Sequence, residues 1–105
     1  MRRDARSLKD LCAHYDLSLN PASIHNALVN AGVMRTVSYL STTGSGEEKT
    51  FKEIVPDYLH LGINRRSMHE FKTEPRFYID SFPQLLAIVV RQIHQELKEI
   101  IEFNT

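Results

Sequence analysis

The chain has 105 residues, of which 42% are hydrophobic, and its thirteen Lys and Arg balance thirteen Asp and Glu. This composition suits one folded domain and excludes a disordered chain, and zero net charge means that any nucleic-acid site must be a local patch. Cys12 is the single cysteine, which excludes an internal disulfide and thiolate-rich zinc sites and fits a reducing cytosol.

No segment reads as a signal peptide or a membrane span. Residues 1–7 are followed by no apolar signal region, and the longest apolar run, 85–90, falls far short of the ~20 residues that cross a bilayer. We therefore expect a cytoplasmic protein that does not bind membranes.

The first predicted element is a helix that follows Ser7 and runs to about Tyr15. The Ser7 hydroxyl can accept an unpaired amide of the first turn. Apolar residues then recur at helical spacing, at Leu8, Leu11 and Cys12.

A second short helix follows a turn over 16–20. It begins at Pro21, whose fixed φ suits the first helical position, and Asn20 is its expected cap. Gly32 is placed to adopt the left-handed conformation that ends a helix. The result is a short helix, a tight turn and a second short helix.

Two β-rich segments, 33–40 and 50–55, predict a hairpin. The first is rich in β-branched and aromatic residues, and the second alternates polar with apolar residues. The Gly- and Ser-rich segment 41–48 between them is the tip, and we expect it to be mobile in the free protein.

Residues 56–70 give mixed signals. They predict one short helical turn over 58–61 that ends at Gly62, followed by a polar loop over 64–67. A further extended segment is expected over 75–79.

The clearest element is a long helix over 81–103, capped by Asp80 or Ser81, with Pro83 in its first turn. Its apolar stripe repeats in alternating steps of four and three residues, which suits either the domain's own core or a dimer seam. We expect the first half to be core and the second half to be an interface. The expected interface residues are Ile93, Leu97, Ile100 and Ile101.

The helix pair and the hairpin together suggest DNA recognition, with the second helix in the major groove and the hairpin as a wing. Asparagine can bond an adenine edge, and basic hairpin residues can contact phosphates. The alternative is a merely solvated face, because the second helix has no Arg or Lys. The expected contacts are Ser23, His25, Asn26 and Asn30 on the helix and Arg35 and Lys49 on the hairpin.

Two basic clusters could supply further phosphate contacts. One is Arg65 with Arg66 in the expected central loop. The other lies at the N-terminus and comprises Arg2, Arg3, Arg6 and Lys9. The alternative is again a solvated surface, because acidic residues lie close to both clusters along the chain.

Nothing in the sequence predicts catalysis, a metal or a cofactor. The five histidines show no metal-binding spacing, and Cys12 lies on an apolar helix face, where free cysteines behave as buried hydrophobes. The segment 44–46 lacks the lysine and helix of a phosphate-binding loop. We expect the protein not to be an enzyme.

Three segments resemble a small domain of phage and prophage regulatory proteins of the antirepressor type. They are FKEI at 51–54, LGIN at 61–64 and, most specifically, TEPRFYIDSFPQLL at 73–86. The N-terminal third is similar to the winged helix-turn-helix modules of the same proteins. The resemblance covers a third to a half of the chain and implies a regulatory or DNA-associated module without catalytic residues.

The sequence thus predicts a single α+β domain over 1–105, winged helix-turn-helix-like, with two short helices, a β-hairpin wing and a long C-terminal helix. One interpretation is a regulatory DNA-binding module that forms a homodimer through its last helix. The other is a protein-interaction module, an antirepressor or an inhibitor of another regulator, that does not bind DNA. Zero net charge favours the second.

Overall fold

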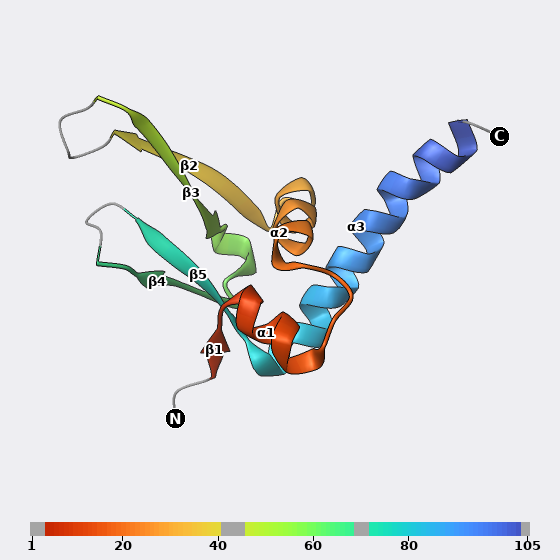
Figure 1. Cartoon of the computed structure of the whole chain (residues 1–105), viewed down its shortest axis with the longest axis horizontal. Coiled ribbons are helices and arrows are strands. Elements are labelled where there is room, and N and C mark those ends of the chain that lie inside the picture. Colours follow the sequence, from red (N-terminus) through yellow and green to blue (C-terminus); the bar gives the residue numbers. More distant parts are fainter. Residues whose placement is uncertain (1–3, 41–45, 69–71, 104–105) are drawn as a thin grey trace.

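Three extensions surround a small central core. The computed structural model describes residues 4–40, 46–68 and 72–103. Two β-hairpins extend from one side of the body, and the C-terminal half of the last helix extends from the other (Figure 1). The Cα radius of gyration is 15.7 Å, whereas a compact domain of this length has about 13 Å. The chain therefore exposes an unusually large surface for its size.

Two short helices, α1 (Leu8–Tyr15) and α2 (Pro21–Asn30), confirm the predicted helix pair. The Ser7 hydroxyl accepts a hydrogen bond at 3.2 Å from the backbone amide three residues later. The Asn20 side-chain oxygen accepts the equivalent bond at 2.8 Å. Both predicted N-caps are present, and each satisfies one amide that has no partner within its helix.

The two helices end in left-handed residues. Gly32 has a φ of 81° and terminates α2 as predicted. Asp16 has a φ of 50° and ends α1, a conformation that aspartate tolerates better than most residues. The five-residue turn after α1 sets the two helices against each other.

The predicted hairpin consists of β2 (Met34–Leu40) and β3 (Glu48–Ile54), with Met34 opposite Ile54. Most of its predicted mobile tip, 41–45, lies outside the described residues. At the base of the hairpin Met34 and Ile54 are buried, so this face of the ribbon points toward the core.

A second hairpin was not predicted. β4 (Gly62–Arg66) pairs antiparallel with β5 (Thr73–Tyr78), and the two-residue strand β1 (Ala5–Arg6) pairs with the other edge of β5. The expected extended segment over 75–79 corresponds to the second half of β5. The chain is thus an α+β domain with two short N-terminal helices, antiparallel strands and a long C-terminal helix.

The prediction for residues 56–70 was wrong in three respects. The helical turn is a 3₁₀ turn at Pro56–Tyr58 rather than at 58–61, and Gly62 begins β4 instead of ending a helix. Arg65 and Arg66 lie in that strand and not in a loop. The physical reason is pairing with β5, and a Cβ at Gly62 would collide with the Arg76 carbonyl oxygen. Only glycine permits this close approach.

The long helix α3 (Phe82–Phe103) starts one residue later than predicted, because Ile79–Ser81 forms a 3₁₀ turn ahead of it. The first half of α3 contributes to the core, as predicted. That core joins α1, α2 and α3 to the bases of both hairpins. Its fully buried side chains are Leu11, Ile24, Leu28, Val33, Met34, Ile54, Leu61, Phe77, Phe82, Leu85 and Val89.

The Asn64 side chain ties the two hairpins together. Asn64 on β4 accepts a hydrogen bond from the Ile54 amide at 2.8 Å and donates one to the Ile54 carbonyl oxygen at 2.9 Å. Both bonds are partly buried. The Asn64 side chain thus supplies the donor and the acceptor that a neighbouring strand would offer to β3.

We expect Asn64→Ala to lower the free energy of unfolding by about 2 kcal/mol, because it leaves two backbone groups of Ile54 without partners. Urea denaturation followed by circular dichroism measures this. The matched control is Asn30→Ala, which removes an exposed hydrogen bond to Glu96 and should cost about 0.5 kcal/mol or less. Equal losses in the two variants would show that Asn64 does not clamp the hairpins.

Candidate functional site

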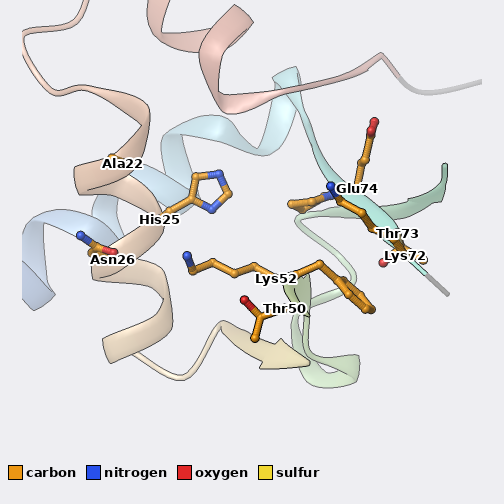
Figure 2. Close-up of a pocket in the computed structure, with 10 residues that line it drawn as sticks. Ala22, His25, Asn26, Thr50, Lys52, Lys72, Thr73 and Glu74 are labelled. Atoms are coloured by element: carbon orange, nitrogen blue, oxygen red, sulfur yellow. The ribbon is translucent and has the colours of Figure 1, made fainter. Parts of the chain in front are cut away.

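An open cleft of about 520 Å³ lies between α2, β3 and the start of β5 (Figure 2). Helix α2 forms one wall and the two hairpins form the other. Its lining residues are Ala22, His25 and Asn26 from α2, Thr50, Phe51 and Lys52 from β3, and Lys72, Thr73, Glu74 and Pro75 from the start of β5.

Strand and helix periodicity place the side chains of the cleft. Lys52 lies two residues before the buried Ile54, so both side chains occupy the same face of β3, toward α2. His25 follows the buried Ile24 and therefore lies at the edge of the buried face of α2. In Figure 2, the His25 ring and the Lys52 chain extend into the space between α2 and β3.

His25 is half-buried, and its Nδ1 atom has no hydrogen-bond partner. Burial, assisted by the positive charge of Lys52, lowers the pKa of His25 below its ordinary value of 6.5. The imidazole is therefore neutral at pH 7 and can donate one N–H and accept one hydrogen bond. Thr73 contributes a second buried atom without a partner, its Oγ1.

The cleft has positive charge that no nearby carboxylate neutralises. Lys52 forms no ion pair with any described residue. Glu74 lines the cleft, but its side chain points away from Lys52 in Figure 2, and its carboxylate lies 3.6 Å from Arg76. Glu53, next to Lys52, bonds Arg35 at 2.6 Å on the opposite face of the hairpin. The arrangement suits an anionic ligand.

The predicted contacts on α2 are not gathered at one place. His25 and Asn26 line the cleft, and Ser23 is half-buried beside the cap of the helix. Asn30 lies one turn farther on and donates a hydrogen bond at 2.8 Å to Glu96 of α3. Only the first two therefore share a surface with the hairpins.

The predicted basic contacts also separate. Arg35 is bound to Glu53, while Lys49 is exposed on the same face of the hairpin. Arg65 and Arg66 are both exposed but, as neighbours in a strand, point to opposite faces. Arg66 shares the face of Asn64, toward the first hairpin.

The N-terminal basic cluster is only partly described. Arg6 forms an ion pair at 2.9 Å with Asp4, and Lys9 is exposed on α1. Arg2 and Arg3 lie outside the described residues. The described part of this cluster therefore offers one side chain that is already paired and one that is exposed.

Sequence reasoning missed Lys52, Lys72 and Thr73. The signal for Lys52 was available, because alternation places it on the same face as Ile54. Lys72 and Thr73 join the cleft only through the β4–β5 hairpin, which was not predicted.

The expected interface on α3 is mostly exposed. Ile93 is half-buried against the core, whereas Leu97, Ile100 and Ile101 are 53%, 60% and 61% exposed. Val90 is 64% exposed and continues the stripe toward the body. The second half of α3 therefore presents an apolar strip that the described chain leaves uncovered.

No protein-family model, curated protein or solved structure matches the chain. The resemblance to phage regulatory domains thus rests on the sequence segments alone. Among the described residues, no helix is long and apolar enough to span a membrane. The same part of the chain contains no cluster of three or more His, Cys, Asp or Glu side chains that could hold a metal ion.

The lowered pKa of His25 makes stability depend on pH. Between the ordinary value of 6.5 and the lower folded value, the unfolded chain binds a proton at His25 that the folded chain does not. The stability advantage of neutral His25 is therefore complete above pH 6.5 and is lost as the pH falls below it. We expect the unfolding free energy of the wild type to fall more steeply with decreasing pH than that of His25→Gln.

Urea denaturation at a series of pH values measures this difference. Identical slopes for the wild type and His25→Gln would contradict the burial of a neutral ring.

Proposed function

We propose that the domain is a winged-helix-like regulatory module of phage or prophage type that binds duplex DNA beside α2 and pairs with a second copy through α3. The observation that carries this proposal is the concentration of basic side chains on the two hairpins. Because the net charge is zero, the amino-acid composition does not reveal this concentration.

Basic residues outnumber acidic residues on the hairpins and the residues adjoining them. Among the described residues the basic set is Arg35, Lys49, Lys52, Arg65, Arg66, Lys72 and Arg76, against Glu47, Glu48, Glu53 and Glu74. Glu70, between β4 and β5 in the sequence, lies outside the described residues. By contrast, the last three turns of α3 carry Lys98 with Glu96, Glu99 and Glu102. The excess of positive charge therefore lies on the side of the molecule away from the end of α3.

The arrangement supports different roles for the hairpins and α2 in DNA binding. The hairpins extend past α2 on one side, as a wing does beside a recognition helix (Figure 1). Exposed lysines and arginines on the hairpins suit phosphates, and Asn26, exposed on α2, suits a base edge. Because α2 has no Arg or Lys, the hairpins must supply most of the affinity.

We expect binding to mixed-sequence duplex DNA that weakens steeply with salt. Arg65→Gln together with Arg66→Gln should weaken binding at low salt and reduce the slope of log K against log salt by about 1, because the two side chains point to opposite faces of β4 and one of them can meet the duplex. Fluorescence anisotropy with a labelled duplex measures both quantities.

The matched control is Arg91→Gln, an exposed arginine of α3 that should leave binding unchanged. Asn26→Ala tests the contribution of α2 in the same assay. Absence of binding at low salt, or equal weakening by Arg91→Gln, would overturn the DNA-binding proposal.

The exposed strip of α3 supports pairing with a second copy. Val90, Leu97 and Ile101 lie along one line of the helix, at steps of seven and four residues.

We expect a solution mass twice the 12.1 kDa of the chain. Leu97→Glu places a charge in the strip and should yield a monomer with unchanged helix content. Glu99→Lys, on the opposite side of the helix, should remain a dimer. Light scattering after size exclusion measures the mass, and a wild-type monomer at tens of micromolar would contradict the pairing.

The exposed strip also favours a second candidate, a protein-interaction module that inhibits another regulator. In that case the strip would bind a different protein instead of a second copy, and the hairpins would not bind DNA. A monomeric wild type that fails to bind duplex DNA and recovers one stoichiometric protein from host lysate would support this candidate.

A further inference from the structure

Two buried atoms without hydrogen-bond partners line the same cleft. They are His25 Nδ1 and Thr73 Oγ1. Among the described residues, no other buried side-chain nitrogen or oxygen lacks a hydrogen-bond partner. Each such atom costs about 1–3 kcal/mol, and native proteins retain few of them. His25 comes from α2 and Thr73 from β5, so each wall of the cleft offers one such atom to a ligand.

The charge of the cleft selects the sign of that ligand. Lys52 extends toward His25 from β3, and Lys72 lines the far side. The neighbouring carboxylate of Glu53 is occupied by Arg35 on the other face of the hairpin, and the Glu74 side chain points away from Lys52. A group with several acceptor oxygens and a negative charge suits the Lys52 ammonium and the neutral His25 ring beside it.

The size and walls of the cleft indicate more than a bare anion. Its volume of about 520 Å³ lies within the range of small-molecule sites. Ala22 and Pro75 provide apolar surface, while Asn26 and Thr50 provide polar groups that can fix an orientation. A phosphate joined to a planar, partly apolar body fits these features.

We propose that the cleft between α2, β3 and β5 binds a phosphate monoester carried by a nucleoside, with the Lys52 ammonium as its charged contact. The phosphate belongs either to a free nucleotide or to the 5′ end of a nucleic-acid strand. This site goes beyond the duplex contacts proposed above, because it requires neither Arg65 nor the exposed face of the hairpins.

Titration of the ¹⁵N-labelled wild-type protein with AMP tests the site. We expect amide shifts confined to α2, β3 and the start of β5. Lys52→Gln should weaken AMP binding at least about tenfold, because it removes a charge-assisted hydrogen bond. The matched control is Lys49→Gln, on the same strand but on the other face, which should weaken it less than about twofold.

Two further ligands identify the group that is recognised. Adenosine should bind much more weakly than AMP, and binding of equal strength would overturn the proposal because the phosphate would then contribute nothing. A short single strand with a 5′ phosphate, compared with the same strand bearing a 5′ hydroxyl, assigns the source. A preference for the phosphorylated strand over AMP assigns the site to strand ends, and the reverse assigns it to free nucleotides.

The His25 ring provides a second readout. The charged groups that line its cleft are Lys52 on β3, Lys72 just before β5 and Glu74 on β5. A bound phosphate beside the imidazole should raise the pKa of His25, and NMR titration of the ring with and without AMP measures the change. An unchanged pKa at saturating AMP would place the ligand elsewhere and overturn the proposal.

The outcomes separate this inference from the proposed function. Weaker duplex binding in Arg65→Gln with Arg66→Gln, with AMP binding intact, is expected if both proposals hold. AMP binding without any duplex binding would support the cleft proposal and overturn the DNA proposal. Duplex binding without AMP binding, or equal effects of Lys52→Gln and Lys49→Gln, would overturn the cleft proposal.

Discussion

Ile54 has a backbone amide and a backbone carbonyl that both point away from β2, at a place where the side chain is buried and water is scarce. Asn64 satisfies both groups, at 2.8 Å and 2.9 Å, with one planar side chain that carries a donor and an acceptor at the right separation. A buried strand edge without such partners would be destabilised by about 1–3 kcal/mol per group. Because β4 carries Asn64 and β3 carries Ile54, these bonds also set how the two hairpins lie against each other. The cleft beside α2 depends on that relation, since Lys52 comes from one hairpin and Thr73 from the other.

The molecule has no net charge, but its basic and acidic residues lie in different places. The hairpins hold most of the described basic residues, and two of these form ion pairs, Arg35 with Glu53 and Arg76 with Glu74. Lys49, Lys52, Arg65 and Arg66 form no ion pair with any described residue and are the side chains that can act on an anionic partner. Lys52 differs from the other three because it faces α2 and a half-buried neutral histidine, where water screens its charge less than on the outer faces. One hairpin can thus present a solvated basic surface on one face and a more selective anion site on the other. The apolar strip of α3 lies at the opposite end and does not compete with either.

Local chemistry explains which parts of the fold could be predicted. Ser7, Asn20 and Gly32 act on amides and carbonyls within a few residues, so the boundaries of α1 and α2 follow from short sequence patterns. The β4–β5 pairing depends on residues that meet only in three dimensions. Its strands contain asparagine, arginines and Pro75, which are typical of loops. Pro75 is tolerated because it lies beyond the two-residue β1, on a part of β5 that has a strand on one side only. Missing this hairpin also concealed the cleft, because Thr73 and Lys72 reach it only through that pairing, while Asn30 was displaced from the expected surface by its bond to Glu96.

Hydrogen exchange at the Ile54 amide tests most directly whether the hairpins form one unit with α2. This amide faces away from β2, and its partner is a side chain of the other hairpin. The structure predicts slow exchange, at a rate close to that of the core amides of α2, and fast exchange in a variant that lacks the Asn64 amide group. Fast exchange of Ile54 in the wild-type protein, at the rate of solvent-exposed strand-edge amides, would show that the hairpins move independently and that the cleft does not persist.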